Sequence, residues 1–131
     1  TRAGAFLMLG RMLHPLELDS PSLALSVPVR VGDKWENQAL PTPAVATSSW
    51  RSPAGAIGHL FVNISGETQP LKIELDARNA TFAASCDAAV CRPQSDDGFQ
   101  PLWKGVSLPK AFATELAPLE VVFVELTPAR P

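Results

Sequence analysis

The sequence predicts an all-β protein, an antiparallel β-sandwich with a short N-terminal helix. Five or more short runs have the spacing and alternation of β-strands, with turn residues between them. The 13 prolines among 131 residues are spread along the chain and leave little room for uninterrupted helices. This length suits one domain. We therefore expect a helix and linker over 1–16 and the sandwich over 17–131.

The first segment has the pattern of a helix. Phe6, Leu9 and Met12 recur at helical spacing, and their Ala, Leu, Met and Arg neighbours are good helix formers. Pro15 would end this helix. Gly10 lies inside it and indicates either close packing or an earlier end.

A β-hairpin is predicted over 44–65. In the turn between its arms, Pro53 presets φ and Gly55 can take the positive φ that follows. The run 71–77 alternates apolar and charged residues, so we expect it to extend this hairpin into a three-stranded meander. Two sets of apolar residues then each share one face of their strand, the second set pointing inward: Leu60, Val62 and Ile64; Leu71, Ile73 and Leu75.

Two more strands are predicted on either side of this meander. Residues 23–31 alternate with a period of two, which indicates a half-buried strand, and Pro28 favours an edge position because it cannot donate a ladder hydrogen bond. The following stretch, 32–43, is polar with two prolines and is predicted to be a connection. Residues 119–126 are apolar on both faces, which is typical of a central strand.

The pattern is weak over 78–105. Within it, 80–84 is a candidate short strand and 91–103 a candidate long loop.

Charge and hydropathy exclude two classes of partner. The net charge is −2 without a basic cluster, so we expect no nucleic-acid binding. No run of about 18 apolar residues exists, so we expect no membrane-spanning helix. Residues 1–13 lack the features of a signal peptide, but the chain also lacks a starting methionine, as a fragment or processed product would. The compartment stays open, with a secreted or extracytoplasmic location among the options.

No catalytic or cofactor motif is visible. The sequence contains no phosphate-binding loop, nucleophile elbow or metal-ligand spacing, so we expect neither catalytic residues, nor a cofactor, nor a metal site in this chain. His14 and His59 are far apart in sequence. Cys86 and Cys91 are close enough in sequence to close a disulfide across a loop, or they are two free, partly buried thiols.

Two tryptophans are candidate glycan-binding residues. Trp35 and Trp103 lie in predicted loops, where an aromatic face could stack on a sugar ring. The alternative is that they cover the ends of the sandwich or pack on a neighbouring domain. Apolar residues make up 46% of the chain against 18% charged, which indicates that some apolar surface faces a partner.

Three segments carry a resemblance to a known family. Residues 48–65, SSWRSPAGAIGHLFVNIS, resemble a hairpin of C-terminal β-sandwich modules in bacterial glycoside-hydrolase-like (β/α)8-barrel proteins. There a strand ending in Trp-Arg-Ser-Pro, a glycine turn and a strand ending in Val-Asn-Ile-Ser recur. Residues 6–15 resemble the last barrel helix and its exit, and 115–126 the final strand of that module. His59 departs from the pattern, which has an aliphatic residue at this position.

The resemblance implies a function that the residues alone do not give. It implies a non-catalytic accessory domain that supports the catalytic barrel domain of a parent protein and helps to bind glycan. The catalytic carboxylates would then belong to the barrel. Two other hypotheses remain: an independent carbohydrate-binding module that uses Trp35 or Trp103, and a small free-standing enzyme, which would need a pocket lined by carboxylates or cysteine.

Overall fold

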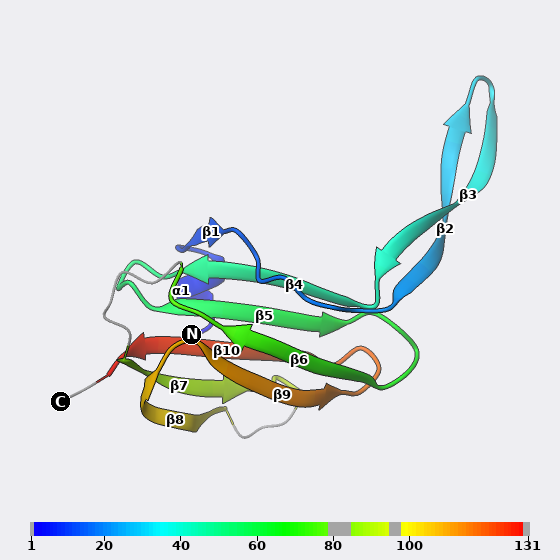
Figure 1. Ribbon diagram of the computed structural model, residues 1–131. Coiled ribbons are helices and arrows are strands. Elements are labelled where there is room, and N and C mark those ends of the chain that lie inside the picture. Colours follow the sequence, from blue (N-terminus) through cyan, green and yellow to red (C-terminus); the bar gives the residue numbers. More distant parts are fainter. Residues whose placement is uncertain (1, 79–84, 95–97, 130–131) are drawn as a thin grey trace.

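The computed structural model describes residues 2–78, 85–94 and 98–129 and shows the predicted all-β sandwich with a short N-terminal helix (Figure 1). Helix α1 (Gly4–Leu7) comes first in the chain. Ten strands follow among the described residues: β1 (Arg11–Leu13), β2 (Ser22–Val31), β3 (Lys34–Pro43), β4 (Val45–Arg51), β5 (Ile57–Asn63), β6 (Gln69–Leu75), β7 (Ser85–Cys91), β8 (Phe99–Ser107), β9 (Lys110–Leu116) and β10 (Val121–Pro128).

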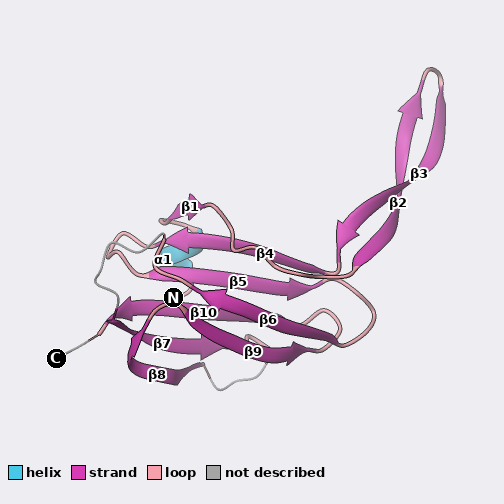
Figure 2. Ribbon diagram, viewed as in Figure 1, coloured by secondary structure: helices cyan, strands magenta, loops and turns pink. Residues whose placement is uncertain are grey.

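The strands form two packed layers and one projecting hairpin. One layer is a six-stranded antiparallel sheet in the order β1-β4-β5-β10-β7-β8, and the other is the pair β6–β9 (Figure 2). The pair β2–β3 extends away from both layers (Figure 1). The predicted central strand is confirmed, because β10 pairs with β5 on one side and β7 on the other.

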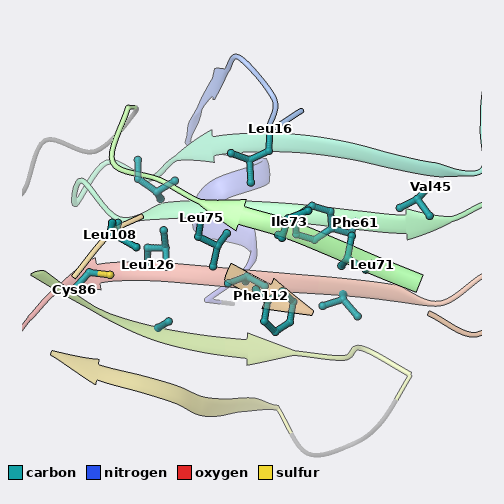
Figure 3. Close-up of a cluster of buried hydrophobic side chains, with 14 of the residues drawn as sticks. Leu16, Val45, Phe61, Leu71, Ile73, Leu75, Cys86, Leu108, Phe112 and Leu126 are labelled. Atoms are coloured by element: carbon teal, nitrogen blue, oxygen red, sulfur yellow. The ribbon is translucent and has the colours of Figure 1, made fainter. Parts of the chain in front are cut away.

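The hydrophobic core lies between the two layers (Figure 3). The inward positions predicted for 71–77 are confirmed, since they are buried on β6 and face the six-stranded sheet. β6 nevertheless does not continue the β4–β5 hairpin as a meander, because it crosses to the second layer and pairs with β9. The core cluster includes these residues: Val45, Ile57, Phe61, Leu71, Ile73, Leu75, Phe112, Leu116, Val122, Val124 and Leu126.

The predicted β4–β5 hairpin is confirmed, with its turn where expected. Ser52 N donates to Ala56 O at 2.9 Å and Gly55 N donates to Ser52 O at 2.9 Å. Gly55 has a φ of 88°, the positive value that glycine accepts without a steric cost. On β5 the inward positions are Ile57, His59 and Phe61, so Leu60 and Val62 lie on the opposite face, which we call the outer face of the six-stranded sheet.

The N-terminal helix is shorter than predicted because of Gly10. A Cβ there would lie 2.2 Å from Phe6 O and 2.8 Å from Arg51 O, so only glycine lets the chain pass this close to β4. Gly10 N donates to Phe6 O at 2.9 Å, and the chain then continues as β1 beside β4. Of the three apolar residues with helical spacing, Phe6 therefore lies in α1, Leu9 in the following turn and Met12 in β1.

The prediction of a connection over 32–43 is wrong, since most of it is strand β3. Gly32 has a φ of 62°, which suits the first central position of the two-residue turn Gly32–Asp33. β3 pairs with β2 over the full length of both strands, although its sequence is polar. A strand that is exposed on both faces need not show an apolar alternation, which explains why the pattern misses it.

The predicted long loop over 91–103 is also partly wrong, because β8 begins at Phe99. Its pairing with β7 shifts register between Cys86 and Ala88 and again between Ala88 and Ala89, and such irregularities interrupt the alternation on which strand prediction relies. The candidate strand at 80–84 lies outside the described residues.

Candidate binding surfaces

The two tryptophans are not brought together. Trp35 lies on β3 near the tip of the projecting hairpin and is 71% exposed. Trp103 lies on β8 at the edge of the sandwich, with its ring edge-on to Phe112 (centroids 6.2 Å apart) and Lys110 Nζ 5.0 Å from its centroid. Both residues are therefore on strands rather than in loops. Much of the Trp103 ring is occupied by protein contacts, whereas Trp35 is open.

The predicted alternative of a Cys86–Cys91 disulfide is wrong, since both are free thiols. They are the second and the last residue of β7, and five steps along an extended strand separate their Cα atoms by about 16 Å. A disulfide needs Cα atoms within about 7 Å. Cys86 is buried in the core, and this burial, with a smaller contribution from Asp87, raises the pKa of its thiol.

His59 forms a buried pair with Ser49 on the inner face of the six-stranded sheet. Ser49 Oγ lies 2.8 Å from His59 Nδ1, and both side chains are almost fully buried. Burial lowers the pKa of His59 to about 4, although the charge of Asp76 acts in the opposite direction. His59 Nε2 has no hydrogen-bond partner among the described residues. Both side chains therefore belong to the interior of the sandwich.

Metal and membrane sites find no support in the part of the chain that the structure describes. Within it, no three His, Cys, Asp or Glu side chains gather as metal ligands. None of the described helices is long and apolar enough to cross a membrane.

A charged groove lies over β10, β7 and β8, on one side of the outer face. Arg2 Nε donates to both carboxylate oxygens of Glu125, at 3.0 and 3.1 Å, and this hydrogen bonding raises the pKa of Arg2. The Arg2 guanidinium carbon also lies 4.3 Å from the centroid of the Phe99 ring. The groove has a volume of about 790 Å³, and its lining combines charged and aromatic side chains: Arg2, Asp87, Phe99, Trp103, Lys104 and Glu125.

An apolar patch lies at the opposite edge of the outer face, beside β1 and β4. We call it the N-terminal patch, and its side chains are exposed, with Met8 at 83%: Leu7, Met8, Leu9 and Met12. Met12 pairs with Trp50 across β1 and β4, so the patch continues onto the sheet. Beside it is a shallow groove of about 150 Å³, lined by Ala46, Thr47, Ser48, Leu60 and Val62.

A second apolar surface runs along the projecting hairpin. We call it the hairpin stripe, and its residues occupy alternate positions on one face: Leu23, Leu25, Val27, Val29, Val31 and Leu40. Leu25 and Leu40 are cross-strand partners, 40% and 51% exposed. None of the stripe residues belongs to the core cluster. The sequence predicts the alternation of these residues but not their exposure to solvent. The residue pattern of a strand does not show whether a second layer covers it.

No protein-family model and no curated protein sequence matches this chain. Solved structures that resemble it include three glycoside hydrolases or proposed glycoside hydrolases: a GH27 β-L-arabinopyranosidase from Geobacillus stearothermophilus (17% identity, TM-score 0.46), a proposed α-N-acetylgalactosaminidase from Bacillus halodurans (14%, 0.48) and a GH30 endoxylanase from Clostridium papyrosolvens (16%, 0.41). The matches cover 66%, 83% and 72% of this chain. The chain spans about a fifth of the length of those proteins, with coverages of 18%, 21% and 23%. These TM-scores are too low to assign a function.

Proposed function

We propose that this chain is a non-catalytic accessory β-sandwich of a glycoside-hydrolase-like protein, and that it packs against the catalytic barrel domain of that protein. The N-terminal patch is the observation that carries the proposal. The resemblance of 6–15 to a last barrel helix and its exit supports the same role, since these residues include the patch.

The exposure of the N-terminal patch supports a partner at this surface. Four large apolar side chains are exposed within six consecutive positions, and Met12 joins them to Trp50 on the sheet. Exposed apolar side chains that gather in this way typically mark an interaction surface. Burying each of them gains roughly 1.5–3 kcal/mol.

The patch rests on a fixed support. Phe6 is buried against Phe123, and Arg2 binds Glu125 on the central strand β10, so both ends of the segment that carries α1 are attached to the outer face. Only the side of this segment that faces away from the sheet remains exposed. A barrel domain that covers it would contact a surface already in place, which lowers the entropic cost of docking.

Charged substitutions in the patch test the proposal. In the 131-residue chain, we expect Met8→Lys and Met12→Lys to leave the melting temperature nearly unchanged, since both side chains are exposed. In the polypeptide that includes the preceding barrel, we expect the same substitutions to separate the unfolding of the two domains in calorimetry. Leu119→Lys is the matched control, because Leu119 is an exposed apolar residue outside the patch, in the turn that precedes β10. Unaltered co-unfolding in both patch variants would contradict the proposal.

A second candidate is an independent carbohydrate-binding module, and the charged groove favours it. The groove combines positive and negative side chains with aromatic rings. This combination suits a neutral polyhydroxylated ligand, which can form hydrogen bonds with the charged side chains and stack on a ring. A glycan-array and calorimetry screen of the chain tests this with Trp35→Ala and Trp103→Ala as separate variants. Binding that only Trp103→Ala abolishes would locate the site in the groove. Binding that neither variant changes, or no binding, would reject these tryptophans as a glycan site.

A further inference from the structure

The hairpin stripe has an apolar face but no sandwich layer to cover it. β2 and β3 pair only with each other among the described strands, and Figure 1 shows them extending away from the body. All five odd-numbered residues from Leu23 to Val31 are apolar and share one face, with Leu40 beside Leu25. A two-stranded hairpin is only marginally stable in water without a further layer on its apolar face. The stripe is therefore a surface built to be covered.

Prolines block the hairpin edges, so a partner must bind the face. The two-residue turn places Val31 opposite Lys34, and these two residues form a hydrogen-bonded pair. From there, every second pair directs its N–H groups toward the opposite strand of the hairpin. Pro28, Pro41 and Pro43 all fall in the intervening pairs, whose backbone groups point outward. Because proline has no N–H, strand addition is disfavoured at both edges.

We propose that the hairpin stripe docks onto an apolar surface of the barrel domain in the same polypeptide, as a second contact separate from the N-terminal patch. This inference rests on the proposed function. The stripe is roughly 27 Å long, from the eight steps between Leu23 and Val31 at about 3.4 Å each. It is mostly one strand wide, about 5 Å, because the β3 residues on this face other than Leu40 are polar: Lys34, Glu36, Gln38 and Thr42. Two surfaces of this size packed together would bury roughly 300 Å² in total, below the ~1,200 Å² of a stable interface between free proteins. A domain on the same chain has a millimolar effective concentration, so a smaller contact is sufficient.

The base of the hairpin holds the stripe in a defined place. Ala44 N donates to Pro21 O at 2.7 Å, Val45 N donates to Ser20 Oγ at 3.0 Å, and Ile64 N donates to Ala44 O at 2.9 Å. The hairpin therefore leaves the body at the start of β4, whereas Met12 of the N-terminal patch lies beside the end of β4. A partner that touches both surfaces must span the length of this strand, roughly 20 Å. A folded domain meets this requirement better than a short peptide.

Hydrogen exchange and a matched pair of double variants test the inference. We expect the amides of 22–43 to exchange at least tenfold more slowly in the polypeptide with its barrel than in the 131-residue chain. Leu25→Lys with Leu40→Glu should abolish this protection. Ser26→Lys with Ala39→Glu is the control, because it places the same cross-strand charge pair on the opposite face of the hairpin and should leave the protection intact.

The outcomes separate this inference from the proposed function. If the barrel protects the segment around Met8 and Met12 but not 22–43, the inference fails and the proposed function stands. If neither segment is protected, both fail. Sedimentation equilibrium of the 131-residue chain should show a monomer at 100 µM. A dimer that Leu25→Lys with Leu40→Glu dissociates would overturn the inference by making a second copy the occupant.

Discussion

Phe6 packs edge-on against Phe123, with ring centroids 5.2 Å apart and planes at 62°, and both rings lie over Gly58. This contact joins the N-terminal segment to the central strand of the six-stranded sheet. It also explains why β5 has a glycine as its second residue in an otherwise well-packed strand. A Cβ at this position would lie 2.4 Å from Phe123 Cζ and 2.9 Å from Phe6 Cδ1.

Gly58→Ala should therefore destabilise the protein by about 1–3 kcal/mol, the usual cost of overpacking a core. Urea denaturation measures the free energy of unfolding. Gly66→Ala is the control, since a Cβ there meets no atom within 4 Å, and we expect it to be nearly neutral. Equal stability of both variants would show that the Phe6–Phe123 contact adapts to an added methyl group.

Stability should fall in acid because of His59. Its pKa is about 4 in the folded protein and 6.5 ordinarily, so between these values the unfolded state binds a proton that the folded state does not. The resulting loss in the free energy of unfolding is absent above pH 6.5 and grows to roughly 3 kcal/mol at pH 4. The free energy of unfolding, measured from pH 4 to 8, should therefore fall less steeply toward acid pH in His59→Gln than in the parent protein. Parallel slopes would mean that His59 takes up a proton in the folded state.

The two thiols should differ in reactivity. Cys86 is fully buried and its thiol pKa is raised, so it should react with an aromatic disulfide reagent only after unfolding. Cys91 is half-buried and should react in the folded protein, though more slowly than a free thiol. Cys91→Ser should remove the native-state reaction and leave one thiol per denatured chain. An intact mass two units lower than the reduced value would instead reveal a disulfide.

Leu119→Gly should stabilise the protein by about 1 kcal/mol. Leu119 has a φ of 61° in the turn that Glu120 N closes with Ala117 O at 3.0 Å, and Pro118 precedes it. A left-handed φ costs a non-glycine residue about 1–2 kcal/mol, which glycine avoids. The side chain is 70% exposed, so its loss costs little packing. Thermal unfolding of Leu119→Gly and Leu119→Ala separates the effects, because alanine keeps the unfavourable φ and should show no gain.

The features that the sequence predicts correctly are those set by neighbours along the chain. Pro53 and Gly55 define the turn of the β4–β5 hairpin, and the apolar run of β10 shows that this strand is covered on both faces. Partners distant in the sequence leave no such mark. Nothing in 71–77 tells that this strand pairs with β9 rather than with β5.

The candidate surfaces could be predicted only in part. The residue type of Trp35 makes it a candidate, and its side chain is exposed. The sequence does not predict the N-terminal patch, because its residues also fit a longer helix, although three consecutive large apolar residues, Leu7 to Leu9, cannot all lie on one helix face. The exposure of the hairpin stripe depends on the absence of a covering layer, which alternation alone does not report.

The closed base of the β2–β3 hairpin has a consequence for how this domain can evolve. Because Pro21 and Ala44 are joined by a hydrogen bond, the chain leaves the sandwich and returns to the same point, and 22–43 contribute no side chain to the core cluster. Insertions, deletions or exchange of this hairpin would leave the hydrophobic core of the body untouched. Selection can therefore reshape the hairpin for a new neighbour while the sandwich keeps its own sequence requirements.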